Sequence, residues 1–75
     1  MTPKQQIVYD TILKLEKAHG RYPRRSELAR ELGISRESAR QFVRALEKKG
    51  KAQTFWSEEE VADVRKVRRL RVKPL

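Results

Sequence analysis

Three stretches of the chain repeat apolar residues at the three- and four-residue spacing of a buried helix face. The pattern predicts helices over about residues 3–18, 26–32 and 36–49. Their apolar positions are Ile7, Val8, Ile12, Leu15, Leu28, Ala29, Leu32, Ala39, Phe42, Val43 and Leu46. Gly33 separates the second helix from the third, and glycine suits a tight turn because it tolerates positive φ. Helices joined so tightly cannot lie flat side by side, so we expect a steeply crossing helix-turn-helix.

Residues typical of helix ends flank these stretches. Thr2 is a candidate N-cap for the first helix, and Gln5 occupies the position of a capping-box partner. Gly20 is expected to end that helix, and Ser35 can cap the third. For the second helix, Ser26 is one candidate N-cap, although the start could lie nearer the preceding proline.

The helical period ends at the third helix, and a strand-like pattern follows. Residues 51–56 and 66–73 predict two antiparallel strands, the second alternating in part. Leu70 and Val72 would face one side of the second strand, and Arg69, Arg71 and Lys73 the other. A two-stranded ribbon is not stable alone, so we expect it to pack on the helices as a wing. The expected packing residues are Phe55, Leu70 and Val72.

The expected fold is therefore mainly α with a small β-ribbon (α+β). It is a winged helix-turn-helix with three helices and a two-stranded antiparallel wing over about residues 51–73. Residues 1–75 would form a single domain, since a chain of this length makes one small core.

The segment between the expected strands is acidic. Residues 57–63 contain four acids and no base, and we expect residues 57–64 to form a long connection in which Ser57 and Glu60 could cap one helical turn. We favour a solvated loop here. The alternative is a surface for a partner protein or for self-association.

Charge narrows the class of partner. The chain has 19 Lys and Arg against 10 Asp and Glu, a formal net charge of +9. Such a balance favours a polyanion such as nucleic acid, although a charged surface can also serve solubility alone.

Several functions are not expected. The chain has no cysteine, and His19 is its only histidine, which argues against a metal site or a thiol nucleophile. No catalytic constellation or phosphate-binding loop appears, so we expect no enzymatic activity, no cofactor and no small-molecule ligand. No stretch approaches the ~20 apolar residues of a membrane span, and the N-terminus lacks a signal-like run. We expect no membrane partner and a cytoplasmic, nucleoid-associated location.

The outer face of the third helix carries residues that suit base edges. Arginine and glutamine match guanine and adenine in the major groove. Those projecting outward or along the flank are Arg36, Glu37, Arg40, Gln41 and Arg44. An ordinary charged helix surface, with Glu37 paired inside the helix, is the alternative. Arg24 and Arg25 at the start of the second helix would suit a phosphate, or are simply solvated.

The order of these segments resembles a known family. LARELGISRESARQF follows the helix-turn-helix pattern, and TPKQQIVYD, HGRYP, SELARELGIS and RALEKKG follow one another as in the N-terminal DNA-binding domain of the LexA repressor family. The resemblance covers about residues 2–51. The turn before the third helix is one residue shorter than in the family, Arg24 replaces the usual Thr cap, and the wing connection is longer and acidic. The bound site sequence therefore cannot be transferred.

The resemblance implies that the third helix enters the major groove and that the wing contacts the backbone. Recognition-helix candidates are Ser35, Arg36, Glu37, Ser38, Arg40, Gln41 and Arg44. Phosphate candidates are Arg24, Arg25 and Ser26 at the helix start, and Arg65, Lys66 and Arg68 on the wing. LexA repressors continue into a self-cleaving, dimerising domain, for which a chain that stops at Leu75 has no room. We therefore expect a homodimer or cooperative binding along DNA.

The leading hypothesis is a sequence-specific double-stranded DNA-binding protein, a small repressor-like transcriptional regulator. A different class is a protein-interaction module that modulates a partner protein through the acidic segment with Phe55 and Trp56. RNA binding is a third hypothesis, weakened by the small number of aromatic residues, which we expect to be half-buried.

Overall fold

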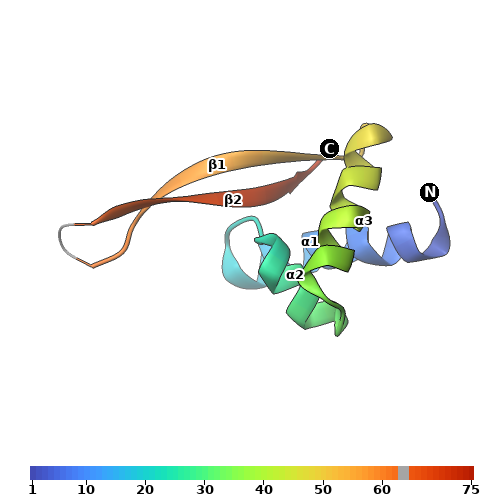
Figure 1. The fold of residues 1–75 in the computed structure, drawn as a ribbon, viewed down its shortest axis with the longest axis horizontal. Helices are drawn as coiled ribbons and strands as arrows, with labels where there is room; N and C mark the ends of the chain where they lie inside the picture. Colours follow the sequence, from blue (N-terminus) through green and yellow to red (C-terminus); the bar gives the residue numbers. More distant parts are fainter. Residues whose placement is uncertain (63–64) are drawn as a thin grey trace.

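Three helices gather at one end of the molecule, and a long β-ribbon runs out from them (Figure 1). The structure is a computed structural model that describes residues 1–62 and 65–75. The elements are α1 (Pro3–His19), α2 (Arg25–Leu32), α3 (Arg36–Lys48), β1 (Ala52–Glu60) and β2 (Lys66–Pro74). The overall extents are 43 × 24 × 23 Å. Three helices and one antiparallel pair of strands confirm the expected α+β class.

The helix ends follow from local chemistry. At the start of α1 the Thr2 side chain accepts from the backbone N–H of Gln5 at 3.2 Å, and the Gln5 side chain accepts from the Thr2 N–H at 3.1 Å. Gly20 ends α1 and Gly33 ends α2, both in the left-handed region with φ of 69° and 67°. Ser35 caps α3 by accepting from the Ser38 N–H at 3.0 Å.

The structure decides between the two expected starts of α2. The start nearer the proline is confirmed, because Arg24, not Ser26, is the N-cap residue, and the helix begins one residue earlier than the expected range of about 26–32. The carboxylate of Glu27 accepts from the Arg24 backbone N–H at 3.1 Å and thereby satisfies an amide that the helix leaves free. An acid at the third helical position replaces the usual small polar cap.

One hydrophobic core joins the helices to the root of the ribbon. Its buried members come from all three helices and both strands: Val8, Ile12, Leu15, Leu28, Val43, Leu46, Ala52 and Val72. Each larger side chain contributes about 1.5–3 kcal/mol by burial. Ile7, expected on the buried stripe, is 56% exposed. The residues of α1 that are buried are Val8, Thr11, Ile12 and Leu15.

Backbone hydrogen bonds hold the root of the ribbon in place. The Val72 N–H donates to the Pro23 carbonyl at 2.9 Å, so β2 is tied to the loop between α1 and α2. The Leu75 N–H donates to the Lys51 carbonyl at 2.9 Å, and the Tyr9 hydroxyl donates to the Leu75 carbonyl at 3.1 Å. The end of β2 is thus bound both to the start of β1 and to α1.

The strands extend further than the sequence pattern predicts. Residues 57–60, expected in a loop or a helical turn, belong to β1, whose nine residues pair with the nine of β2. The register places Glu58 opposite Arg68 and Glu60 opposite Lys66. These opposite charges across the strands offset the low strand propensity of three consecutive acids. Asp63 and Val64, also assigned to the connection, lie outside the described residues.

Within the described part of the chain, none of the helices is both long and apolar enough to cross a membrane.

Candidate nucleic-acid interface

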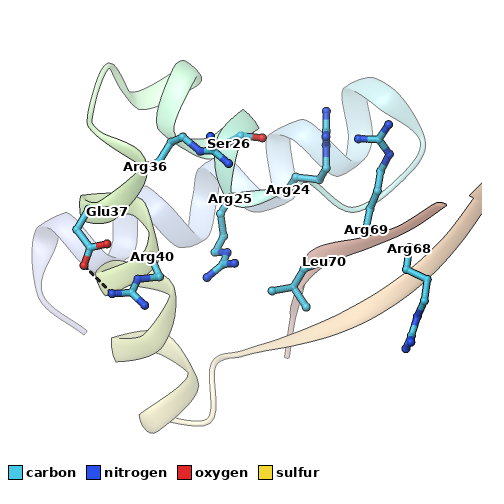
Figure 2. Close-up of a pocket in the computed structure, with 9 residues that line it drawn as sticks. All are labelled: Arg24, Arg25, Ser26, Arg36, Glu37, Arg40, Arg68, Arg69 and Leu70. Carbon is cyan, nitrogen blue, oxygen red and sulfur yellow. Dashed lines mark hydrogen bonds and ion pairs between the residues drawn. The ribbon is translucent and has the colours of Figure 1, made fainter. Parts of the chain in front are cut away.

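Six arginines from three elements surround one groove of about 400 Å³. They come from the start of α2, the first turns of α3 and the middle of β2. The lining residues are Arg24, Arg25, Ser26, Arg36, Glu37, Arg40, Arg68, Arg69 and Leu70. Figure 2 shows Arg25 and Leu70 pointing into the space between α3 and β2. We call this the arginine groove.

The secondary structure explains why these side chains converge. Arg36 and Arg40 are one helical turn apart on α3, beside the stripe that buries Ala39 and Val43. Arg24 and Arg25 stand at the first turn of α2, immediately after the buried Pro23. The core that holds the ribbon against the helices therefore also brings β2 beside the two helix starts.

The electrostatics of the groove are strongly positive. Among the lining residues, Glu37 is the only acid, and its carboxylate accepts from the Arg40 guanidinium at 2.7 Å (Figure 2). The hydrogen bond from Arg40 holds the pKa of Glu37 below its ordinary value. The helix starts add free backbone N–H groups and the positive end of each helix dipole. The groove is suited to bind a phosphate chain, which guanidinium groups bind in bidentate fashion.

Some sequence-predicted residues lie outside the groove. Ser35 and Ser38 bond to each other, since the Ser35 hydroxyl donates to the Ser38 hydroxyl at 2.9 Å and caps the helix as well. Gln41 and Arg44 are exposed further along α3. Arg65 and Lys66 are exposed at the outer end of the ribbon, where the Lys66 ammonium lies 4.0 Å from Glu58.

Two groove residues were missed by the sequence reasoning. Arg69 was recognised as basic but not chosen, and Leu70 was assigned to packing. Leu70 is half-buried and lines the groove, and it is not among the described side chains that pack against the core. The run of basic residues in β2 was the available signal for Arg69. A run of charge does not show how far each side chain is buried, and Arg69 is half-buried whereas Arg68 is exposed.

A buried arginine, Arg71, lies beside the groove, since the acids that bind it also contact Arg24 and Arg69. Arg71 was expected on the side of the strand opposite the packing residues Leu70 and Val72, yet it is only 3% exposed. Its guanidinium donates to both carboxylate oxygens of Glu59 at 2.7–2.8 Å and to the Tyr22 carbonyl at 2.6 Å. It also lies 3.7 Å from Glu27. The face that carries Arg71 is turned toward the α1–α2 loop, so the residue fills an interior position.

The acids around Arg71 also contact groove arginines. Glu59 lies 3.8 Å from Arg69, and Glu27 lies 3.3 Å from Arg24. The hydrogen bonds from Arg71 hold the pKa of Glu59 below its ordinary value. Burial raises the pKa of Glu27, but the hydrogen bonds from Arg24 outweigh burial and the net pKa is lowered. We call Arg71, Glu59 and Glu27 the Arg71 cluster.

The two aromatic residues of β1 have different environments. Phe55 is half-buried and meets Tyr22 edge to face, with ring centroids 5.8 Å apart. Trp56 is 60% exposed, contrary to the expectation that both are half-buried. The Arg68 guanidinium lies over its indole, 5.4 Å from the ring centroid. Alternation along the strand sends these neighbouring side chains to opposite faces.

Metal coordination finds no support in the part of the chain that the structure describes, where no three His, Cys, Asp or Glu side chains converge. Comparison of the chain with protein-family models, with curated proteins and with solved structures returns no match.

Proposed function

We propose that the protein binds double-stranded DNA and acts as a small, repressor-like transcriptional regulator. In this proposal the three helices and the ribbon work as a winged helix-turn-helix. The observation that carries it is the arginine groove, in which α2, α3 and β2 each supply cations to one concave surface with a single acid among its lining residues. A chain with a net charge of +9 supports the same class of partner.

The helix α3 is the proposed reading element. An α-helix fits the major groove, which is about 12 Å wide. Arg40 is oriented by Glu37, and an arginine held in this way loses less freedom when it bonds to guanine. Gln41 and Arg44 continue the exposed surface of α3 toward bases or phosphates.

The rest of the groove is the proposed backbone contact. Arg24 and Arg25 combine guanidinium groups with the free amides of the α2 start, and Arg68 and Arg69 face them from β2. A DNA strand in the groove would lie between α3 and the ribbon. The resemblance to the LexA DNA-binding domain, noted from the sequence, agrees with this orientation. Two copies, as a homodimer or side by side on DNA, would supply the contacts that one small module lacks.

The alternative of a protein-binding acidic segment has less support. Glu59 is bonded to Arg71, and Glu58 and Glu60 face basic residues across the ribbon. Acids engaged within the chain are poorly placed to attract a basic partner.

Selection of bound sites from a random duplex library tests the proposal. We expect a defined motif, palindromic if two copies bind symmetrically. Against the selected site, Arg40→Ala and Gln41→Ala should each cost about 1–3 kcal/mol and relax the choice of base at one position. Absence of binding to any duplex at ~150 mM salt would overturn the proposal. Equal losses on the selected site and on random duplex would remove base reading while leaving backbone binding.

A further inference from the structure

The exposed indole of Trp56 is the feature that the proposed function leaves unused. Trp56 is the only tryptophan of the chain and is 60% exposed. It pairs across the ribbon with Leu70, and Arg68 occupies the same face of the ribbon. Leu70 and Arg68 both line the arginine groove. The indole therefore stands at the edge of the surface proposed to hold a DNA strand.

The position of the indole is fixed by the strand and by a cation–π contact. It lies on a paired strand, not in a loop, and the Arg68 guanidinium lies over the ring at 5.4 Å from the centroid. A cation over an aromatic face is attracted by the ring quadrupole. Phe55, the neighbouring aromatic, is used inside the fold against Tyr22. Trp56 thus keeps a large, oriented aromatic surface in solvent.

A nucleobase is the ligand that fits such a surface beside a basic groove. Bases stack on exposed aromatic rings whatever their sequence, and a neighbouring cationic groove follows the phosphates. Bases inside a duplex already stack on one another, and separating them costs a few kcal/mol per step. An unpaired base next to a duplex carries no such cost.

We propose that Trp56, with Arg68, is a stacking site for an unpaired base, and that it directs the protein to DNA with a single-stranded flank beside the duplex. This proposal rests on the proposed DNA-binding function. The duplex would occupy α3 and the arginine groove, and the first unpaired base of the flank would lie on the indole. Arg68 would remain over the ring or contact the adjoining phosphate.

The test compares a blunt duplex with the same duplex carrying a short single-stranded tail of thymidines. Tails are placed on either strand and at either polarity, and dissociation constants are measured at one salt concentration. We expect one tailed form to bind about tenfold more tightly than the blunt form, the scale of one base stacked on an aromatic ring. Binding of the tail should quench the tryptophan fluorescence, which reports on this site alone because the chain has a single tryptophan.

Three variants isolate the indole. Trp56→Ala should abolish the preference for the tailed duplex and leave the affinity for the blunt duplex within about twofold, whereas Trp56→Phe should retain most of the preference. Leu13→Ala is the matched control, since Leu13 is 40% exposed on α1, outside the groove, and should change neither constant.

The outcomes separate this proposal from the proposed function. Equal affinity for blunt and tailed duplexes, or an unchanged preference in Trp56→Ala, overturns the stacking site while duplex binding stands. Binding of tailed DNA or oligothymidine without binding of any blunt duplex supports the stacking site and overturns the proposed function. Binding to none of them overturns both.

Discussion

Arg40 and Arg71 are the same residue type in opposite settings. Arg40 stands in the arginine groove with 46% of its side chain exposed, and Glu37, to which it donates, is more exposed still. Arg71 has 4% of its side chain exposed and is bonded to Glu59 and to a backbone carbonyl. One guanidinium faces solvent in a groove with excess positive charge, while the other is neutralised within the fold.

The difference teaches how a small basic protein can use arginine for two purposes. A buried guanidinium must have its hydrogen bonds and its charge satisfied internally, because desolvation is costly. A groove arginine without enough internal acids keeps its bonding capacity for an external anion. Glu59 and Glu27 connect the two settings, because each lies near Arg71 and near one groove arginine. The Arg71 cluster therefore fixes the ribbon in the position that forms one wall of the groove.

Arg71→Met is expected to have the largest effect, a loss of stability. Removing the guanidinium leaves Glu59, Glu27 and the Tyr22 carbonyl without their shared partner. We expect a loss of about 3 kcal/mol in the free energy of unfolding, measured by urea titration. DNA affinity should fall as well, because the ribbon no longer holds Arg68 and Arg69 beside α2.

Arg44→Met is the matched control for stability. Arg44 is exposed on α3, so the same substitution there should change the free energy of unfolding by no more than about 0.5 kcal/mol. If both variants lose the same amount, the Arg71 cluster does not anchor the ribbon. Arg71→Lys should recover only part of the loss, since an ammonium cannot reproduce the bidentate bonds to Glu59.

Acid should release the ribbon, a smaller effect than removal of Arg71. The folded-state pKa values of Glu59 and Glu27 lie below their ordinary values. Carboxylates with depressed pKa values contribute stability that is present above the unfolded pKa of about 4.3 and is lost as pH falls through the folded pKa. Stability should therefore decline below about pH 5, measured by urea unfolding across pH.

Glu59→Gln tests which carboxylate is responsible for the acid dependence. This variant should be less stable than the parent at neutral pH and should lose less on acidification. Glu31 also has a lowered pKa, through its bond to Lys14, but that pair is exposed on the surface. Glu31→Gln should leave most of the acid dependence in place. The reverse result, with Glu31 dominant, would contradict the role given to the Arg71 cluster.

Local chemistry made the helical part of the fold predictable. Thr2, Gly20 and Ser35 act through neighbours a few residues away, so their roles follow from the sequence alone. The start of α2 was also predicted as a phosphate contact from its charge and helix position, the first turns of α3 as part of the recognition helix, and Arg68 of β2 as a wing contact. That these residues line one groove could not be predicted, because the position of the ribbon relative to the helices was not known from the sequence.

Long-range pairing explains what the sequence did not reveal. Residues 57–60 were assigned to the connection between the strands, yet Glu58 and Glu60 lie opposite basic residues of β2. Arg71 bonds to Glu59, twelve residues earlier, and to Tyr22, 49 residues earlier. Alternation assigns Arg71 to a face of the strand but does not tell which face the helical end covers. For the same reason, Trp56 and Phe55 could not be separated into exposed and half-buried residues.

Substitution of two arginines on α2 gives the smallest expected effect, a change in DNA affinity. It tests directly whether arginines of the groove contact DNA. Arg25 lines the groove, whereas Arg30 is exposed on the same helix outside it. We expect Arg25→Ala to weaken binding to selected and random duplexes alike and to lower the slope of log K against log salt by about one. Arg30→Ala removes the same formal charge and should leave the slope unchanged. A salt titration of both variants distinguishes a localised contact from net charge, because equal slopes would mean that the groove arginines contribute only their share of the +9.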